Sequence, residues 1–146
     1  MDWQEFTDDV AQLAHLIDFV PDIIIGITRG GVVPARVLAT YLQVDEMHCL
    51  WVQRKGKERK IASTLVADLV GKKVLIVDDM METSGVMTTA RKHVESRGAV
   101  VRTACLYTMP HSLQPPDYSL RVVPEVQQFP WEKDITQSLV TQRLIK

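Results

Sequence analysis

The 146-residue sequence has few cysteines, no long apolar run and almost no net charge. Its two cysteines, Cys49 and Cys105, each lie in an apolar stretch and form no metal-type pair, so we expect two buried thiols. No apolar segment approaches the roughly 20 residues that a membrane-spanning helix requires. A net charge of −1 provides no overall field that would attract nucleic acid or anionic lipid. We therefore expect neither a nucleic-acid nor a membrane partner, and any anion-binding site must be built locally.

The N-terminal residues 1–5 also lack the basic start and apolar stretch of a signal peptide. Together with the expected free thiols, this predicts a cytoplasmic location. The length, with 46% hydrophobic and 24% charged residues, predicts a single globular domain over residues 1–146.

The hydrophobic pattern alternates between the periods of helices and of buried strands. Apolar residues at helical spacing predict helices over residues 2–18, 32–42 and 86–96. Continuous apolar runs predict buried strands over residues 23–27, 74–77 and 100–107, and further strands are predicted over 47–52 and 61–66. The alternation predicts an α/β fold, with a mainly parallel twisted sheet flanked by helices.

Prolines interrupt the pattern after Met109. This predicts a small irregular cap, or hood, over about residues 108–146, which packs with the N-terminal helix and ends in a short helix over 135–145. The core of the domain is then expected over about residues 20–107.

Two loops rich in small or polar residues follow buried strands of the predicted sheet. The loop 28–31 reads Thr-Arg-Gly-Gly, and the loop 78–85 reads Asp-Asp-Met-Met-Glu-Thr-Ser-Gly. In parallel sheets, ligands bind beyond the carboxyl ends of the strands. We therefore expect both loops to lie at the ligand-binding edge.

The loop 78–85 has the chemistry of a phosphate site. Thr83, Ser84 and Gly85 form a small hydroxylic turn before a helix, whose first N–H groups lack partners, so we predict an anion cup. Asp78 and Asp79 are adjacent carboxylates that repel each other, which indicates ribose hydroxyls, Mg²⁺ or basic partners nearby. A simpler alternative is that the acids only favour the helix N-terminus, but the full pattern of the loop argues against it.

The residues of both loops resemble a known family. Residues 74–85 (VLIVDDMMETSG) resemble the phosphoribosyl-pyrophosphate (PRPP) motif of type I phosphoribosyltransferases, a motif that PRPP synthetases and some regulatory proteins share. Residues 26–35 (GITRGGVVPA) are similar to the family's pyrophosphate loop, particularly in xanthine-guanine phosphoribosyltransferases and their archaeal relatives. Those proteins also have an early tryptophan, like Trp3, and a Pro-Trp-acid segment, like residues 130–132.

The resemblance implies transfer of a 5-phosphoribosyl group from PRPP to a nucleobase, expected to be a 6-oxopurine, with Mg²⁺ bound and pyrophosphate released. It implies that Thr28, Arg29 and Gly30 hold the pyrophosphate, often through a non-proline cis peptide, and that Asp78 and Asp79 hold the ribose and the metal. It also implies that Thr83, Ser84 and Gly85 bind the 5-phosphate of the ribose. Glu82, at a position usually occupied by aspartate, is implied to receive or share a proton of the base.

The charged segment 54–60 has two interpretations. By resemblance it is a flexible lid whose closure brings Lys55, Lys57 or Arg59 over the diphosphate and excludes water. Alternatively, it is a solvated charged loop. The sequence leaves both open.

The sequence departs from the family pattern at several positions. Val86 stands where a phosphate-binding hydroxyl is usual, and Met109 where 6-oxopurine enzymes usually carry a lysine. Val126 and Gln127 replace an expected Trp-Ile pair. We expect binding of the phosphoribosyl group to be retained and recognition of the base to be altered. Two functions stay open: a nucleobase-salvage transferase, or a catalytically weak PRPP- or nucleotide-binding regulatory protein. The resemblance also suggests a homo-oligomer.

Overall fold

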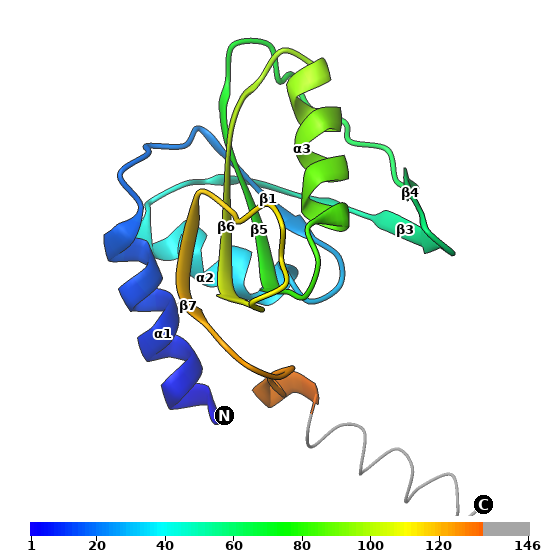
Figure 1. Ribbon diagram of the computed structural model, residues 1–146. Helices are drawn as coiled ribbons and strands as arrows, with labels where there is room; N and C mark the ends of the chain where they lie inside the picture. Colours follow the sequence, from blue (N-terminus) through cyan, green and yellow to red (C-terminus); the bar gives the residue numbers. More distant parts are fainter. Residues whose placement is uncertain (133–146) are drawn as a thin grey trace, which may run out of the picture.

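A five-stranded parallel sheet forms the centre of the protein, whose computed structural model describes residues 1–132 (Figure 1). The sheet has the order β2-β1-β5-β6-β7, and every neighbouring pair is parallel. Its strands are β1 (Ile23–Ile27), β2 (Glu46–Leu50), β5 (Lys73–Met81), β6 (Val100–Thr108) and β7 (Tyr118–Val122). The helices are α1 (Trp3–Leu16), α2 (Val32–Tyr41) and α3 (Gly85–Ser96), and the strands β3 (Val52–Lys55) and β4 (Glu58–Ile61) form a separate antiparallel hairpin. The predicted α/β fold with a mainly parallel sheet is confirmed.

Helices cover both faces of the sheet, with α3 on one face and α1 and α2 on the other (Figure 1). Because successive side chains of a strand point to opposite faces, Ile23 and Ile25 pack with α3, whereas Ile24 packs with α1 and α2. All five residues of β1 are buried, which explains why the strand is a continuous apolar run. Within residues 1–132, none of the helices combines the length and the apolar composition needed to cross a bilayer.

The chain order of the strands reverses between β1 and β5. From β1 the chain passes through α2 to β2 on one side, and the strand on the other side of β1 is β5. At such a switch point the connections after two adjacent strands leave toward opposite faces of the sheet, which opens a crevice at their carboxyl ends. The loops after β1 and β5 flank this crevice, as the sequence predicts.

The strand β5 is longer than the sequence predicts, because residues 78–81 belong to it and not to the loop. Met80 and Met81 pair with Tyr107 and Thr108 of β6, so the ladder continues past the two aspartates. Met81 is buried and Met80 packs against the α1–α2 side of the sheet. This apolar packing keeps the segment extended until Glu82.

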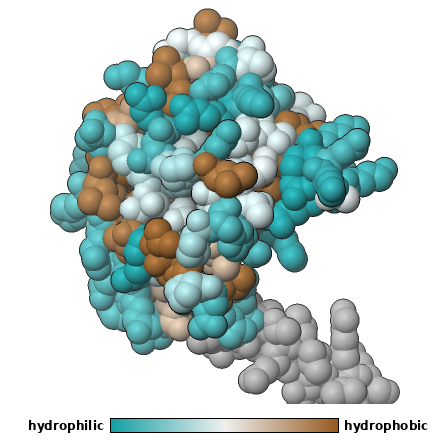
Figure 2. Space-filling model, viewed as in Figure 1, coloured by the Kyte–Doolittle hydropathy of each residue, from teal (hydrophilic) through white to brown (hydrophobic). Residues whose placement is uncertain are grey.

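The charged segment 54–60 forms a hairpin, contrary to the prediction of a loop. Val52 and Ile61 face each other across it, and Gly56, with a φ of 62°, allows the tight turn. Val52 is buried and Ile61 packs against the α3 side of the core, which anchors the base of the hairpin. The predicted strands 47–52 and 61–66 are therefore wrong in their bounds, since β2 ends at Leu50 and β4 already ends at Ile61. Figure 2 shows the hairpin as a hydrophilic projection.

The predicted irregular hood contains a regular strand, β7, which pairs in parallel with β6 at the edge of the sheet. The sequence hides it because the strand is short and lies between Pro116 and Pro124. The helix predicted over 135–145 lies outside the described residues. Cys105 is buried as expected, but Cys49 is exposed because it lies on the edge strand β2.

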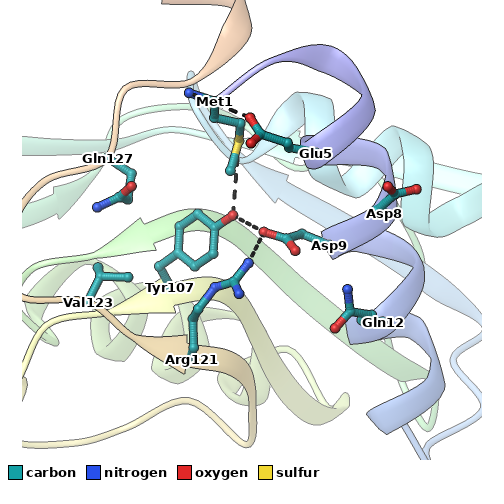
Figure 3. Close-up of a pocket in the computed structure, with 9 residues that line it drawn as sticks. All are labelled: Met1, Glu5, Asp8, Asp9, Gln12, Tyr107, Arg121, Val123 and Gln127. Atoms are coloured by element: carbon teal, nitrogen blue, oxygen red, sulfur yellow. Dashed lines mark hydrogen bonds and ion pairs between the residues drawn. The ribbon is translucent and has the colours of Figure 1, made fainter.

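A buried polar contact fastens α1 to the sheet (Figure 3). The carboxylate of Asp9 accepts hydrogen bonds from the Tyr107 hydroxyl and from the Arg121 guanidinium. Burial and the neighbouring Asp9 raise the pKa of Tyr107 to about 12, so this hydroxyl stays protonated and donates at neutral pH. The Tyr107 ring in turn stacks on Phe129 of the hood, with centroids 5.9 Å apart.

Replacing Asp9 with alanine is expected to lower the free energy of unfolding by about 2–3 kcal/mol, because it leaves a buried hydroxyl without its acceptor. Asp8→Ala, which removes an exposed carboxylate one residue away, is the matched control and is expected to change stability by less than about 0.5 kcal/mol. Denaturant unfolding measures both values. Equal stabilities for the two variants would contradict the structural role of Asp9.

Candidate active site

A cleft of about 760 Å³ lies at the carboxyl ends of β1 and β5. Thr28, Arg29 and Gly30 line it from the loop after β1, and Asp78 and Asp79 line it from the end of β5. The hairpin also contributes to the walls, and so does the hood, through Val126, Gln127, Phe129, Trp131 and Glu132. Segments from four parts of the sequence therefore meet in one cavity.

Two glycines let the loop after β1 pack directly against the end of β5. A Cβ atom on Gly30 would overlap the carboxylate of Asp79, and one on Gly31 would overlap the backbone of Val77. The peptide bond between Thr28 and Arg29 is cis, as the resemblance leads one to expect. The loop predicted to hold pyrophosphate and the acids predicted to hold ribose thus touch each other.

The two aspartates form a half-buried acidic pair. Burial, and then the negative charge of Asp79, raise the pKa of Asp78 well above its usual range, while Arg54 acts in the opposite direction. Burial is also the main cause of the raised pKa of Asp79, to which the charge of Glu132 contributes. Each carboxylate accepts one backbone N–H, from Asp79 for Asp78 at 2.9 Å and from Met80 for Asp79 at 2.6 Å. A pair of this kind favours a cation or hydroxyl donors as its ligand.

Asp78 and Asp79 fit Mg²⁺ in one particular mode. Among residues 1–132, no group of three or more His, Cys, Asp or Glu side chains converges to form a complete metal cage. Mg²⁺ is, however, commonly held by one or two carboxylates together with substrate phosphates and waters. The acidic pair therefore suits a magnesium ion that arrives with a phosphorylated ligand.

The predicted anion cup lies where the chain turns from β5 into α3. Glu82 and Val86 line the cleft, whereas Thr83, Ser84 and Gly85, which lie between them in the sequence, are not among its lining residues. The segment bends instead of continuing as a strand, and α3 begins at Gly85. The N-cap Ser84 makes no side-chain hydrogen bond to the helix, so its hydroxyl does not occupy the first N–H groups.

The basic residues of the hairpin divide into two sets. Arg54 lines the cleft together with Arg29, although the sequence does not single it out. Lys55 and Lys57, which the resemblance places over the diphosphate, are exposed residues of the hairpin and do not line the cleft. The structure thus brings Arg54 to the acids and leaves the two lysines outside.

The hood supplies an apolar wall of stacked aromatic rings. Phe129 and Trp131 both line the cleft, and their rings stack with centroids 4.7 Å apart at an interplanar angle of 8°. Gln127 lines the cleft beside them. Met109 does not: it follows β6, and its N–H donates to the carbonyl of Met81. A planar heterocycle suits such a wall better than a sugar or a phosphate does.

A cleft at the switch point of a parallel sheet, beside the start of a helix, is where α/β proteins bind nucleotides and other phosphorylated ligands. Residues 1–138 match the family described as the phosphoribosyl transferase domain. The chain belongs to this family, and its fold is that of the type I phosphoribosyltransferases.

Known proteins of different names are similar to this chain. The purine phosphoribosyltransferase from Pyrococcus horikoshii Ot3 superposes with a TM-score of 0.82 at 30% identity, over 91% of this chain and 92% of that protein. Ribose-phosphate pyrophosphokinase 2, chloroplastic, from Oryza sativa subsp. japonica is 34% identical over 76 residues, or 52% of this chain and 19% of that protein. Orotate phosphoribosyltransferase from Methanospirillum hungatei JF-1 is 30% identical over 89 residues, or 61% of this chain and 49% of that protein.

The matches cover 19% and 49% of the two curated relatives, so this chain spans half or less of their length. Their names differ in the base they mention, or mention none. What the three names have in common is a phosphorylated ribose.

Proposed function

We propose that this protein transfers the 5-phosphoribosyl group of PRPP to the nitrogen of a purine base, with release of pyrophosphate, in nucleobase salvage in the cytoplasm. The contact between Gly30 and the Asp79 carboxylate carries the proposal, because it joins the pyrophosphate loop to the ribose-binding acids within one cleft. The leaving group and the sugar of PRPP are held side by side when these two loops are adjacent.

The proposed roles follow the charge distribution of the cleft. Arg29 and the Thr28–Gly30 backbone bind the diphosphate, whose negative charge grows as its bond to the ribose breaks. Asp78 and Asp79 bind the ribose hydroxyls and would hold Mg²⁺, which would supply positive charge near the diphosphate. Thr83, Ser84 and Gly85 bind the 5′-phosphate at the start of α3. Glu82, an exposed acid of the cleft wall, accepts or shares the proton of the base.

A purine is proposed as the acceptor, and a 6-oxopurine as the first choice. The stacked Phe129 and Trp131 fit a planar ring system, and the Pyrococcus horikoshii relative is a purine phosphoribosyltransferase at 92% coverage. The cationic side chains of the lining, Arg29 and Arg54, come from the loop after β1 and from the hairpin, whereas the hood contributes Gln127. Recognition of the purine edge is therefore assigned to the Gln127 side chain and the hood backbone.

The direct test measures pyrophosphate release from PRPP and Mg²⁺ with guanine, xanthine, hypoxanthine, adenine, uracil and orotate. Turnover with a purine is expected. Tight PRPP binding without turnover on any base would instead favour a regulatory protein of the same fold. Turnover with uracil or orotate alone would reject the purine but keep the transferase.

Arg29→Ala is expected to raise the KM for PRPP about 10- to 100-fold with a smaller effect on kcat. The variant loses a charge-assisted contact to the diphosphate, and such contacts contribute roughly 1.5–3 kcal/mol. Steady-state kinetics against PRPP measure the change. Arg36→Ala removes an exposed arginine of α2 that contacts Thr40 and serves as the control. An unchanged KM for PRPP in Arg29→Ala would show that Arg29 does not bind the diphosphate.

A further inference from the structure

Two arginines face each other across the hairpin on the same side. Arg54 and Arg59 are directly paired in the register of β3 and β4. Like charges directly opposite each other destabilise an antiparallel pair, so nothing in the stability of the hairpin alone accounts for them. Arg54 lines the cleft near Asp78, which indicates that this side of the hairpin is turned toward the ligand.

The Arg59 guanidinium lies against the beginning of α3. A Cβ atom built on Gly85 would be 3.5 Å from the Arg59 Nε and 3.6 Å from its Cγ. The terminal Nη1 donates to two carbonyls of the hairpin, Gly56 at 3.1 Å and Glu58 at 3.0 Å, and these bonds fix the orientation of the group. Arg59 is thus held in place by its own hairpin while its inner edge faces Gly85.

The Nε–H of Arg59 is buried and has no hydrogen-bond partner among the described residues. Buried donors in proteins are nearly always paired, and an arginine N–H left without an acceptor calls for an explanation. The neighbouring group is the phosphate cup of the proposed function, at Thr83, Ser84 and Gly85. A phosphate oxygen there would be the missing acceptor.

The residue that follows the cup, Val86, leaves room for a further phosphate donor. Val86 is buried at the first turn of α3 and offers no hydroxyl, although the family pattern has one there. A guanidinium beside Gly85 replaces that lost donor with a charged one, which forms a stronger bond to a phosphate.

We propose that Arg59 binds the 5′-phosphate of the phosphoribosyl group through its Nε–H, so that the hairpin closes the phosphate cup instead of covering only the diphosphate. This inference rests on the proposed function, because it assumes a sugar phosphate in the cleft. It separates two roles within one hairpin, with Arg54 near the acids and Arg59 at the sugar's phosphate.

The test compares two ligands that each carry one of the two anionic groups of PRPP, ribose 5-phosphate and Mg²⁺-pyrophosphate, by calorimetry on the full chain. In Arg59→Met, which keeps the aliphatic contact with Gly85, the Kd for ribose 5-phosphate is expected to rise about 10- to 100-fold. The Kd for pyrophosphate is expected to stay within about twofold. Arg59→Ala is expected to reproduce the same split, with thermal unfolding confirming that both variants are folded.

Lys60→Ala is the matched control, because it removes a positive charge from the adjacent position of β4, which points to the opposite side of the hairpin. It is expected to change neither Kd. Unchanged ribose 5-phosphate binding in both Arg59 variants, or an equal loss of pyrophosphate binding, would overturn the assignment while the transferase activity of the wild type still stood. A wild-type protein that binds neither ligand would overturn the proposed function together with it.

Discussion

Asp79→Asn is expected to lower kcat/KM for PRPP by at least about a hundredfold while the protein stays folded. The Asp79 carboxylate lies at the junction of the two loops, against Gly30, where ribose hydroxyls and Mg²⁺ are proposed to bind. Asparagine has nearly the same shape but no charge, and loss of one well-placed electrostatic group costs an enzyme roughly 10²–10³ in rate. Initial rates over a range of PRPP and Mg²⁺ concentrations measure the effect.

Asp45→Asn provides the matched control for this prediction. Asp45 is an exposed acid between α2 and β2 and does not line the cleft. The substitution removes the same charge from the protein and is expected to leave turnover within about twofold. Full activity in Asp79→Asn would reject the proposed ribose and metal role of Asp79.

The stability of Asp79→Asn separates a functional loss from unfolding. Burial raises the pKa of Asp79 in the folded protein above its value in the unfolded chain, so folding favours the protonated carboxyl. The stability gained from the protonated carboxyl is fully present below pH about 3.9, the pKa of an unperturbed aspartate. It is lost as the pH rises through the raised pKa of the folded protein.

Without metal, Asp79→Asn should therefore unfold at the same temperature as the wild type near pH 3, where Asp79 is protonated. At pH 7 it should unfold at a higher temperature, because asparagine carries no buried charge. Calorimetric scans without Mg²⁺ or PRPP measure both temperatures. A variant that is less stable than the wild type at pH 7 would show that the charged carboxylate stabilises the fold, contrary to the direction of its pKa.

The core of the fold is predictable because its signal is local. The apolar run of β1 indicates a strand buried on both faces, and the small-residue loops after β1 and β5 indicate a binding edge. The contact between Gly30 and Asp79 follows only once β5 is known to lie beside β1, since carboxyl ends of adjacent parallel strands meet. That β5 lies beside β1 is a tertiary fact, and the sequence supports it only through the resemblance.

The hairpin and the hood are less predictable because their signals depend on partners distant in the sequence. Arg54 reaches the cleft because β3 and β4 pair in a register fixed by Val52 and Ile61. Read as a run of charges, the same residues indicate a solvated loop. The spacing of Val52 and Ile61 around Gly56 is the one signal of a hairpin that the sequence holds.

The aromatic wall is hard to predict for a similar reason. The sequence shows Trp131 only within the Pro-Trp-acid segment 130–132, and the structure places it both in the lining of the cleft and in the packing of the hood. Its ring stacks on Phe129 and lines the cleft, while it also contacts Phe6 of α1 with centroids 5.1 Å apart. The place of Trp131 depends on how α1 packs against the hood, and no local sequence pattern encodes that packing.

Gly30→Ala is expected to lower kcat/KM by more than about a hundredfold, although alanine is the smallest possible addition. Its Cβ would occupy the space of the Asp79 carboxylate, so either the carboxylate or the loop after β1 has to move. A displacement of about 1 Å in a catalytic group costs about a hundredfold in rate. Kinetics with PRPP measure the loss, and the double variant Gly30→Ala/Asp79→Asn tests its cause. If the methyl group acts by displacing Asp79, the double variant is expected to be about as slow as the slower single variant.

Gly71→Ala is the control for the general effect of placing a methyl group on a glycine. Gly71 has a positive φ and open space around its Cβ position, so this variant has backbone strain without steric overlap. It is expected to lose a little stability and almost no activity, because the strain lies in the turn before β5, and Gly71 does not line the cleft. If the losses of Gly30→Ala and Asp79→Asn simply multiply in the double variant, the two residues act independently. The contact that joins the pyrophosphate loop to the acids would then have no part in catalysis.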